Sequence, residues 1–206
     1  MSKRRRTIET AADAADAASG SELRIIGGTM RGRKILYTGD PRTRPMKDRV
    51  REAVFNLVGP SVKDKMAIDL FAGTGALGFE ALSRGAARAV FIERHFPTAA
   101  AIRRNAEQLG VAGRCEIVPG DAFIWARRPA QWGDWAWTVF CSPPYDLYQN
   151  RQEDLLELLA RFAADAPPQS SLVVEADERF EMSLLPRPAE WDVRHYPPAV
   201  VGILRV

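Results

Sequence analysis

The sequence predicts an α/β protein built on a mostly parallel sheet, and three observations support this. From Met66 onward, short apolar runs typical of buried strands alternate with segments whose apolar residues recur at helical spacing. The run that ends at Asp69 is followed by a glycine-rich stretch, 73–78, typical of a tight turn from strand to helix. The last two apolar runs, 191–196 and 200–206, leave no room for a helix between them and predict an antiparallel pair.

The elements of this core follow in order along the chain. The predicted strands are 66–71, 88–92, 115–118, 136–141, 171–175, 191–196 and 200–206. The predicted helices are 76–83, 97–109, 123–128 and 151–164. Pro97 suits a helix start, whereas Gly85 and Gly110 suit helix ends. We therefore predict a mostly parallel seven-stranded sheet with an antiparallel C-terminal hairpin.

The chain before this core divides into a tail and a basic extension. Residues 1–22 hold few large apolar side chains and predict a disordered tail. Residues 23–206 predict one domain, in which 23–59 form an N-terminal β-hairpin and helix and 60–206 form a Rossmann-like core. Apolar residues at helical spacing predict a helix over 46–58, with Lys47 and Arg51 on its exposed face.

Composition excludes several classes of protein. The chain has 206 residues, of which 46% are hydrophobic, which suits one globular domain with its own core. No apolar run approaches about 18 residues, and the start lacks the apolar region of a secretory signal, so we expect a cytoplasmic protein with no membrane contact. Cys115 and Cys141 fall in predicted buried strands and, with His95 and His195, show no spacing for zinc ligands. We expect reduced thiols and no metal.

Positive charge is concentrated in one short segment. Residues 23–51 carry nine basic side chains against Asp40 and Asp48, a net charge of +7, whereas the whole chain carries +3. Such a concentration predicts binding to a polyanion, although a solvated basic face is the alternative. The candidate contacts for nucleic acid are Arg24, Arg31, Arg33, Arg44, Lys47, Arg49 and Arg51.

The glycine-rich stretch is the first candidate for a ligand site. It matches Gly-x-Gly-x-x-Gly between a strand and a helix, which suggests a nucleotide-type cofactor, and Gly73 and Gly75 would let a ligand approach the main-chain amides. A tight turn whose glycines serve only packing is the alternative. Asp69 would repel a pyrophosphate but attract a cation. S-adenosylmethionine suits this charge, because it carries an ammonium and a sulfonium and no phosphate.

Polar side chains end the first four core strands. Asp69, Glu93, Asp121 and Ser142 occupy these positions, and the carboxyl ends of parallel strands meet at the edge where ligands bind. Taken singly, Glu93 could be a solvated strand end and Asp121 a helix N-cap. Together they predict one ligand site. The stretch 142–145, which follows the fourth strand, has no role in hydride transfer, the reaction of dinucleotide-binding enzymes.

These motifs resemble those of a known group of enzymes. The stretches 69–78, 120–122 and 142–145, with Glu93, are similar to the ordered motifs of class I S-adenosylmethionine-dependent methyltransferases. A narrower resemblance, to the RsmD family, rests on 24–28, 31–33, 44–45, 48–52 and 82–85. It covers 23–206 and implies methylation of a guanine N2 amine in 16S rRNA or the assembling small ribosomal subunit. We expect a monomer.

The resemblance also implies roles for individual residues. Asp69 would face the ammonium of the cofactor, Glu93 its ribose hydroxyls and Asp121 its adenine amine, with the Ala122 amide close to the ring. The full implied cofactor set is Asp69, Ala72, Gly73, Thr74, Gly75, Glu93, Arg94, Asp121, Ala122 and Ser142.

The target base would be held by the tetrapeptide Ser142-Pro143-Pro144-Tyr145. The amine would donate to Ser142 Oγ and the Pro143 carbonyl, whose direction the prolines fix, and Tyr145 would stack on the flipped base. The family usually has Asp at position 142, and a neutral hydroxyl stabilises a developing positive charge less well. The sequence therefore predicts that Ser142→Asp equals or exceeds the parent rate.

Other functions remain open on the sequence alone. The tetrapeptide also suits an amino-methyltransferase that acts on adenine or cytosine in DNA or another RNA. An RNA-binding ribosome assembly factor with a vestigial cofactor site is the alternative from another class. A dinucleotide oxidoreductase is disfavoured by Asp69 and by the terminal antiparallel pair.

Overall fold

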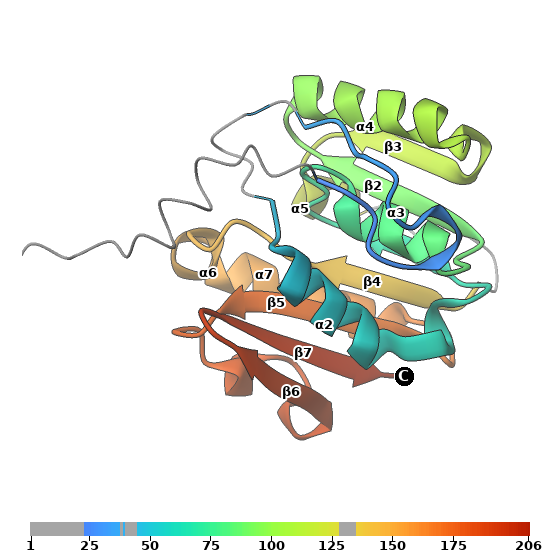
Figure 1. The fold of residues 1–206 in the computed structure, drawn as a ribbon. Helices are drawn as coiled ribbons and strands as arrows, with labels where there is room; N and C mark the ends of the chain where they lie inside the picture. The colour runs from blue at the N-terminus through green and yellow to red at the C-terminus, as the bar shows by residue number, and fades with distance from the viewer. Residues whose placement is uncertain (1–22, 38, 40–44, 128–134) are drawn as a thin grey trace, which may run out of the picture.

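The computed structural model describes residues 23–37, 39, 45–127 and 135–206. Its centre is a seven-stranded sheet in the order β3-β2-β1-β4-β5-β7-β6 (Figure 1). The strands are β1 (Met66–Asp69), β2 (Arg88–Glu93), β3 (Cys115–Pro119), β4 (Trp137–Cys141), β5 (Ser171–Asp177), β6 (Trp191–Tyr196) and β7 (Ala199–Arg205). Strands β1 to β5 pair in parallel, whereas β7 runs antiparallel to both β5 and β6. The predicted fold class is confirmed.

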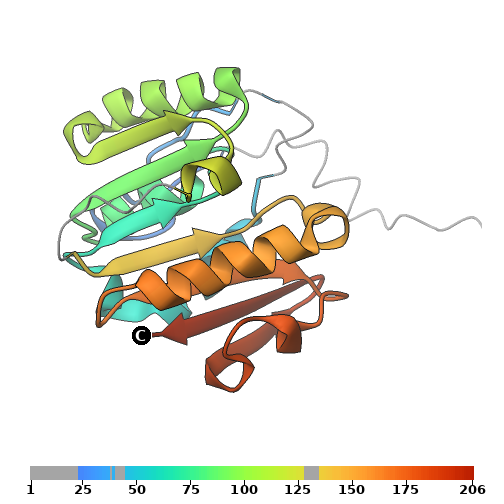
Figure 2. The ribbon, with the colours of Figure 1, turned by 180° about the vertical axis from the view of Figure 1, so that it is seen from behind.

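Helices cover both faces of the sheet. They are α2 (Asp48–Val58), α3 (Ala76–Ser83), α4 (Phe96–Leu109), α5 (Ala122–Trp125), α6 (Leu147–Asn150) and α7 (Gln152–Asp165). Helices α2, α3 and α4 lie on one face, and α5, α6 and α7 lie on the other (Figures 1 and 2). Short 3₁₀ helices occupy Gly28–Met30, Gly59–Val62, Ala112–Arg114, Met182–Leu184 and Pro188–Glu190. Helix α5 ends earlier than predicted, and α6 was not predicted.

The core consists of two apolar layers, one on each face of the sheet. On β2, Ala89 and Phe91 pack in the layer under α3 and α4, whereas Val90 and Ile92 pack in the layer under α7. Successive side chains of a strand point to opposite faces, so a central strand with both faces covered is apolar throughout. This burial explains why the core strands read as unbroken apolar runs.

The N-terminal extension differs from the predicted hairpin. Its two strands are reduced to one antiparallel bridge between Arg24 and Lys34, and a 3₁₀ helix occupies the turn. The physical reason is that the segment lies on α3, whose side chains supply partners for its amides. Met30 N donates to Ser83 Oγ at 2.8 Å, and Ser83 Oγ donates in turn to the Gly27 carbonyl.

The structure leaves some predictions untested and confirms others only in part. The predicted disordered tail, 1–22, and Arg44 lie outside the described residues. Cys141 is buried, as predicted, but Cys115 is only partly buried; both thiols are free. Within the described ranges, no helix has the length and apolar character needed to cross a membrane.

Candidate active site

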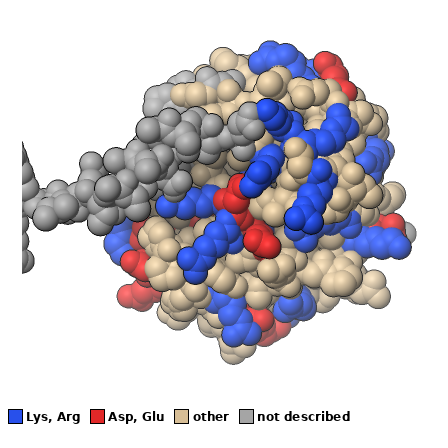
Figure 3. Space-filling model, viewed as in Figure 1, with Lys and Arg blue, Asp and Glu red and all other residues tan. Residues whose placement is uncertain are grey.

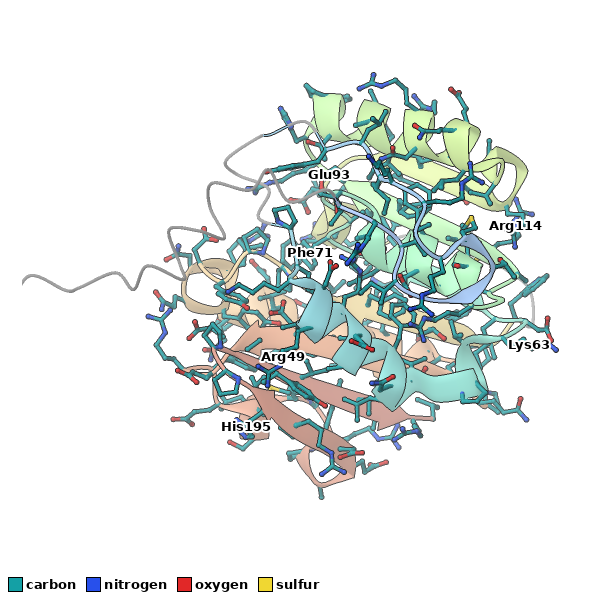
Figure 4. All side chains as sticks on the ribbon, in the orientation of Figure 1. Arg49, Lys63, Phe71, Glu93, Arg114 and His195 are labelled. Atoms are coloured by element: carbon teal, nitrogen blue, oxygen red, sulfur yellow. The ribbon has the colours of Figure 1, made fainter. Side chains whose placement is uncertain are left out.

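A cavity of about 630 Å³ opens at the carboxyl ends of the central strands. This volume lies in the range that holds cofactors and other small ligands. Asp69, Glu93, Asp121 and Ser142 all line it, so the structure brings together the four predicted strand ends. Figure 4 shows Glu93 at the carboxyl end of β2 and Phe71 just after β1, far from Lys63 and Arg114, which precede β1 and β3 at the amino ends of the strands.

Glu93 shapes the glycine-rich loop as well as the cavity. Its Oε2 accepts a hydrogen bond of 2.8 Å from Gly73 N, and its Oε1 accepts one of 2.7 Å from His95 N. The carboxylate thus joins the turns that follow β1 and β2. Each oxygen keeps a second lone pair for a ligand. Ala72, Gly73, Thr74 and Arg94, also predicted for the cofactor, line the same cavity.

Gly75 has the left-handed backbone that a tight turn into a helix requires. It is not among the residues that line the cavity. It precedes α3 with φ of 79°, and a Cβ at this position would lie 2.8 Å from Cε2 of Phe79. Glycine is required here by the left-handed backbone and by packing against Phe79. Packing therefore accounts for glycine at position 75, whereas Gly73 lines the cavity, and a contact of Gly75 with the cofactor stays a prediction.

Asp69 is almost fully buried, with 1% of its surface exposed. Its Oδ2 accepts a hydrogen bond of 3.1 Å from Gly78 N. Burial raises the pKa of Asp69 to about 7, the Glu93 charge adds to the rise, and the Gly78 bond opposes it. A cation in the cavity would favour the ionised form of this carboxyl. The site therefore suits a positively charged ligand group beside Asp69.

Asp121 lines the cavity and caps the N-terminus of α5. Its Oδ1 accepts hydrogen bonds from Phe123 N at 2.8 Å and Ile124 N at 3.2 Å, so the N-cap alternative holds for this oxygen. Its Oδ2 lies 3.7 Å from Nη1 of Arg151, and the Arg151 guanidinium lies 4.0 Å from the centre of the Phe123 ring. Sequence reasoning missed this contact, because only the packing of the segment before α7 brings Arg151 to Asp121.

The tetrapeptide that follows β4 is tied to the neighbouring strand by Glu175. Ser142 Oγ donates to Glu175 Oε2 at 2.7 Å, and the Tyr145 hydroxyl donates to Glu175 Oε1. The parallel register pairs Cys141 with Val174, so Ser142, which directly follows β4, lies beside Glu175 of β5. Sequence reasoning missed Glu175, although it ends the fifth predicted strand as the four chosen residues end theirs.

The basic extension forms one wall of the cavity. Pro45, Met46, Lys47 and Val50 line it together with the strand ends. Figure 3 shows Lys and Arg side chains gathered on the face that carries this extension. Of the predicted contacts for nucleic acid, Arg24, Arg31, Arg33, Lys47 and Arg49 are exposed.

Arg51 is not exposed, so its prediction as a contact for nucleic acid is wrong. Its side chain is fully buried, and Nη2 donates to Asp48 Oδ1 at 2.9 Å and to the Arg24 carbonyl at 2.6 Å. Burial lowers the pKa of its guanidinium, and the charges of Asp48 and Glu80 oppose that change. Arg33, although exposed, donates to the Leu109 carbonyl at the end of α4.

Known proteins share this sequence pattern. A family model described as conserved hypothetical protein 95 matches residues 23–195. Ribosomal RNA small subunit methyltransferase D of Escherichia coli K12 is 43% identical over 128 residues, which cover 62% of this chain and 63% of that protein. The chain belongs to the RsmD family. YlbH of Bacillus subtilis is 30% identical over 160 residues, which cover 78% of this chain and 85% of YlbH.

Solved structures share the fold of this RsmD-family chain. The yhhF protein of Escherichia coli superposes with a TM-score of 0.71 and 30% identity, over 89% of this chain and 97% of that one. An RNA methyltransferase from Salinibacter ruber, solved with S-adenosyl-L-homocysteine, gives a TM-score of 0.55 at 21% identity, over 79% of this chain and 94% of that one. The architecture is that of class I methyltransferases.

Proposed function

We propose that this RsmD-family protein transfers a methyl group from S-adenosylmethionine to the N2 amine of a guanine in small-subunit rRNA. One observation carries the proposal: Asp69, Glu93 and the stretch 142–145 come from separate strands and line one cavity, beside a basic surface. The relative named ribosomal RNA small subunit methyltransferase D supports the choice of substrate.

The residues of the cavity fit S-adenosylmethionine. Bound there, this cofactor would supply an electrophilic methyl group on a sulfonium. We assign its ammonium to Asp69, whose buried carboxyl lacks the stabilisation that water gives a charge, and its ribose hydroxyls to Glu93. Asp121 and the Ala122 amide would recognise the adenine.

The target amine would lie against the stretch 142–145. Its N–H groups would donate to Ser142 Oγ and to the Pro143 carbonyl, and the ring of Tyr145 would stack on the extruded base. Held in this way, the amine would direct its lone pair at the methyl group that the cofactor supplies, and the nitrogen would give up one proton to solvent after the transfer.

The exposed basic residues would hold the RNA backbone. Arg24, Arg31, Lys47 and Arg49 are exposed, and Lys47 also lines the cavity, so phosphate contacts would place a nucleotide at its opening. We further propose that the protein acts as a monomer, without a metal, in the cytoplasm. Among the described residues, no group of three or more His, Cys, Asp or Glu side chains is placed to hold a metal ion.

Methyl transfer to three substrates tests the proposal. The protein is incubated with labelled S-adenosylmethionine and either free 16S rRNA, assembled small subunits or DNA, and labelled nucleosides are identified by mass. We expect N2-methylguanosine from one of the two ribosomal substrates. Methylated adenine or cytosine would favour the alternative amino-methyltransferase. Failure to bind the cofactor in calorimetry would favour the assembly factor.

A further inference from the structure

Glu175 binds both hydroxyl groups of the proposed amine site. Ser142 Oγ donates to one carboxylate oxygen at 2.7 Å, and the Tyr145 hydroxyl donates to the other. Tyr148 holds the backbone of β5 at this point, because its hydroxyl donates to the Glu175 carbonyl at 2.8 Å. Glu175 itself is 7% exposed and lines the cavity.

This arrangement decides which way the Ser142 hydroxyl points. A free hydroxyl can rotate and act as a donor or an acceptor, but an ionised carboxylate can only accept. Because Ser142 gives its proton to Glu175, the lone pairs of its Oγ are left for other partners. A target amine offers N–H groups, so this orientation suits the amine and not a carbonyl oxygen of the base.

Through Ser142, the Glu175 carboxylate also brings a negative charge close to the proposed position of the amine, where the Ser142 side chain itself is neutral. A nitrogen that accepts a methyl group becomes positive, and the Ser142 hydroxyl alone carries no charge to stabilise it. The Glu175 carboxylate lies one hydrogen bond behind Ser142 and reaches the same cavity. The other carboxylate oxygen, Oε1, accepts from the Tyr145 hydroxyl and so holds this residue beside the cavity that it lines.

We propose that Glu175 is a positioning residue of the amine site: it orients Ser142 and Tyr145 and provides the negative charge that Ser142 lacks. This inference rests on the proposed function. The alternative is that Glu175 only ties the loop 142–145 to β5. In that case its loss would lower stability and cofactor affinity, and a carboxylate placed elsewhere in the site would not replace it.

Single-turnover methyl transfer by Glu175→Gln is the first part of the test, because glutamine keeps the size and removes the charge. Glu178→Gln is the matched control, since Glu178 is exposed on the same segment and does not line the cavity. We expect Glu175→Gln to lower the rate roughly ten- to hundredfold. Its affinities for S-adenosylmethionine and RNA should stay within about twofold of the parent values.

Rescue by a relocated carboxylate is the second part. Ser142→Asp in the Glu175→Gln background puts the charge back beside the amine, and we expect it to recover about tenfold in rate. An active parent with an unaffected Glu175→Gln variant would overturn this inference alone. A double variant that folds well but does not recover any rate would also overturn it. A parent that methylates no ribosomal substrate would overturn the proposed function, and this inference with it.

Discussion

Glu80 Oε1 accepts a hydrogen bond of 2.7 Å from Gly27 N, which joins α3 to the N-terminal extension. Its Oε2 accepts a second bond, from Ile26 N at 2.8 Å, and Arg84 Nε donates to Oε1 at 2.8 Å. Glu80 is fully buried, and Arg51 Nε lies 4.0 Å from it. This carboxylate therefore holds the extension that forms one wall of the cavity.

We expect Glu80→Ala to destabilise the protein by about 3 to 5 kcal/mol. The change leaves two backbone amides without their acceptor and removes a charge beside the buried Arg51. Urea unfolding measures the loss. The control is Glu157→Ala, an exposed position on α7, which should change stability by less than about 0.5 kcal/mol. Equal stabilities for the two variants would show that the extension docks without Glu80.

We expect Asp69→Asn to stabilise the free protein at pH 8 and to weaken its binding of S-adenosylmethionine. The folded pKa, about 7, lies above the ordinary 3.8, so stability falls as the pH rises from about 4 to 7. This rise of roughly three units corresponds to at most about 4 kcal/mol. Asparagine removes this loss and still accepts from Gly78.

Unfolding at pH 5 and pH 8, with calorimetry of cofactor binding, checks the Asp69 prediction. The gain in stability should be larger at pH 8 than at pH 5. For the parent, cofactor affinity should fall as the pH drops below about 7, because protonated Asp69 cannot pair with an ammonium. A variant with the affinity of the parent at pH 8 would remove Asp69 from the cofactor site.

We expect Arg49→Gln to weaken RNA binding and to lower the salt dependence of that binding. Each lost phosphate contact should reduce the slope of log K against log salt by about 0.7 to 0.9. Lys63→Gln is the matched control, because Lys63 is exposed near the amino end of β1, far from Arg49 (Figure 4). Filter binding over a range of salt concentrations gives both slopes. If the two variants have the same slope, the RNA lies on another face.

We expect Ser142→Ala to lower kcat about two- to tenfold and to leave cofactor affinity almost unchanged. The loss should be smaller than for Glu175→Gln, because the Glu175 charge remains. Ser142→Asp should run close to the parent rate, since two adjacent carboxyls share one proton and add no net charge. Tyr145→Ala should be slower than Ser142→Ala, because stacking worth about 1 to 3 kcal/mol is lost.

Single-turnover kinetics on one RNA substrate compares these tetrapeptide variants. If Ser142→Ala and Tyr145→Ala both keep the parent rate, the stretch 142–145 does not hold the base. A rate for Ser142→Asp far above the parent would show that Glu175 supplies little charge to the amine, whatever the result for Glu175→Gln.

The sequence by itself determined the sheet, the longer helices that cover it and the ends of the strands at which the cavity opens. Apolar periodicity is local, and it reports burial on one face or on both. The parallel order then places strand ends together, which is why the amino-acid pattern alone was enough to choose Asp69, Glu93, Asp121 and Ser142. Their roles toward cofactor and substrate stay predictions.

Only the tertiary structure decided which side chains meet. Arg51 reads as an exposed cation on an amphipathic helix, but the extension and Glu80 enclose it. Gly75 reads as a ligand contact, but Phe79 fills the space beside it. Glu175 meets Ser142 because the register of β4 and β5 brings together residues 33 positions apart. Such pairings depend on register and helix packing, which no local pattern encodes.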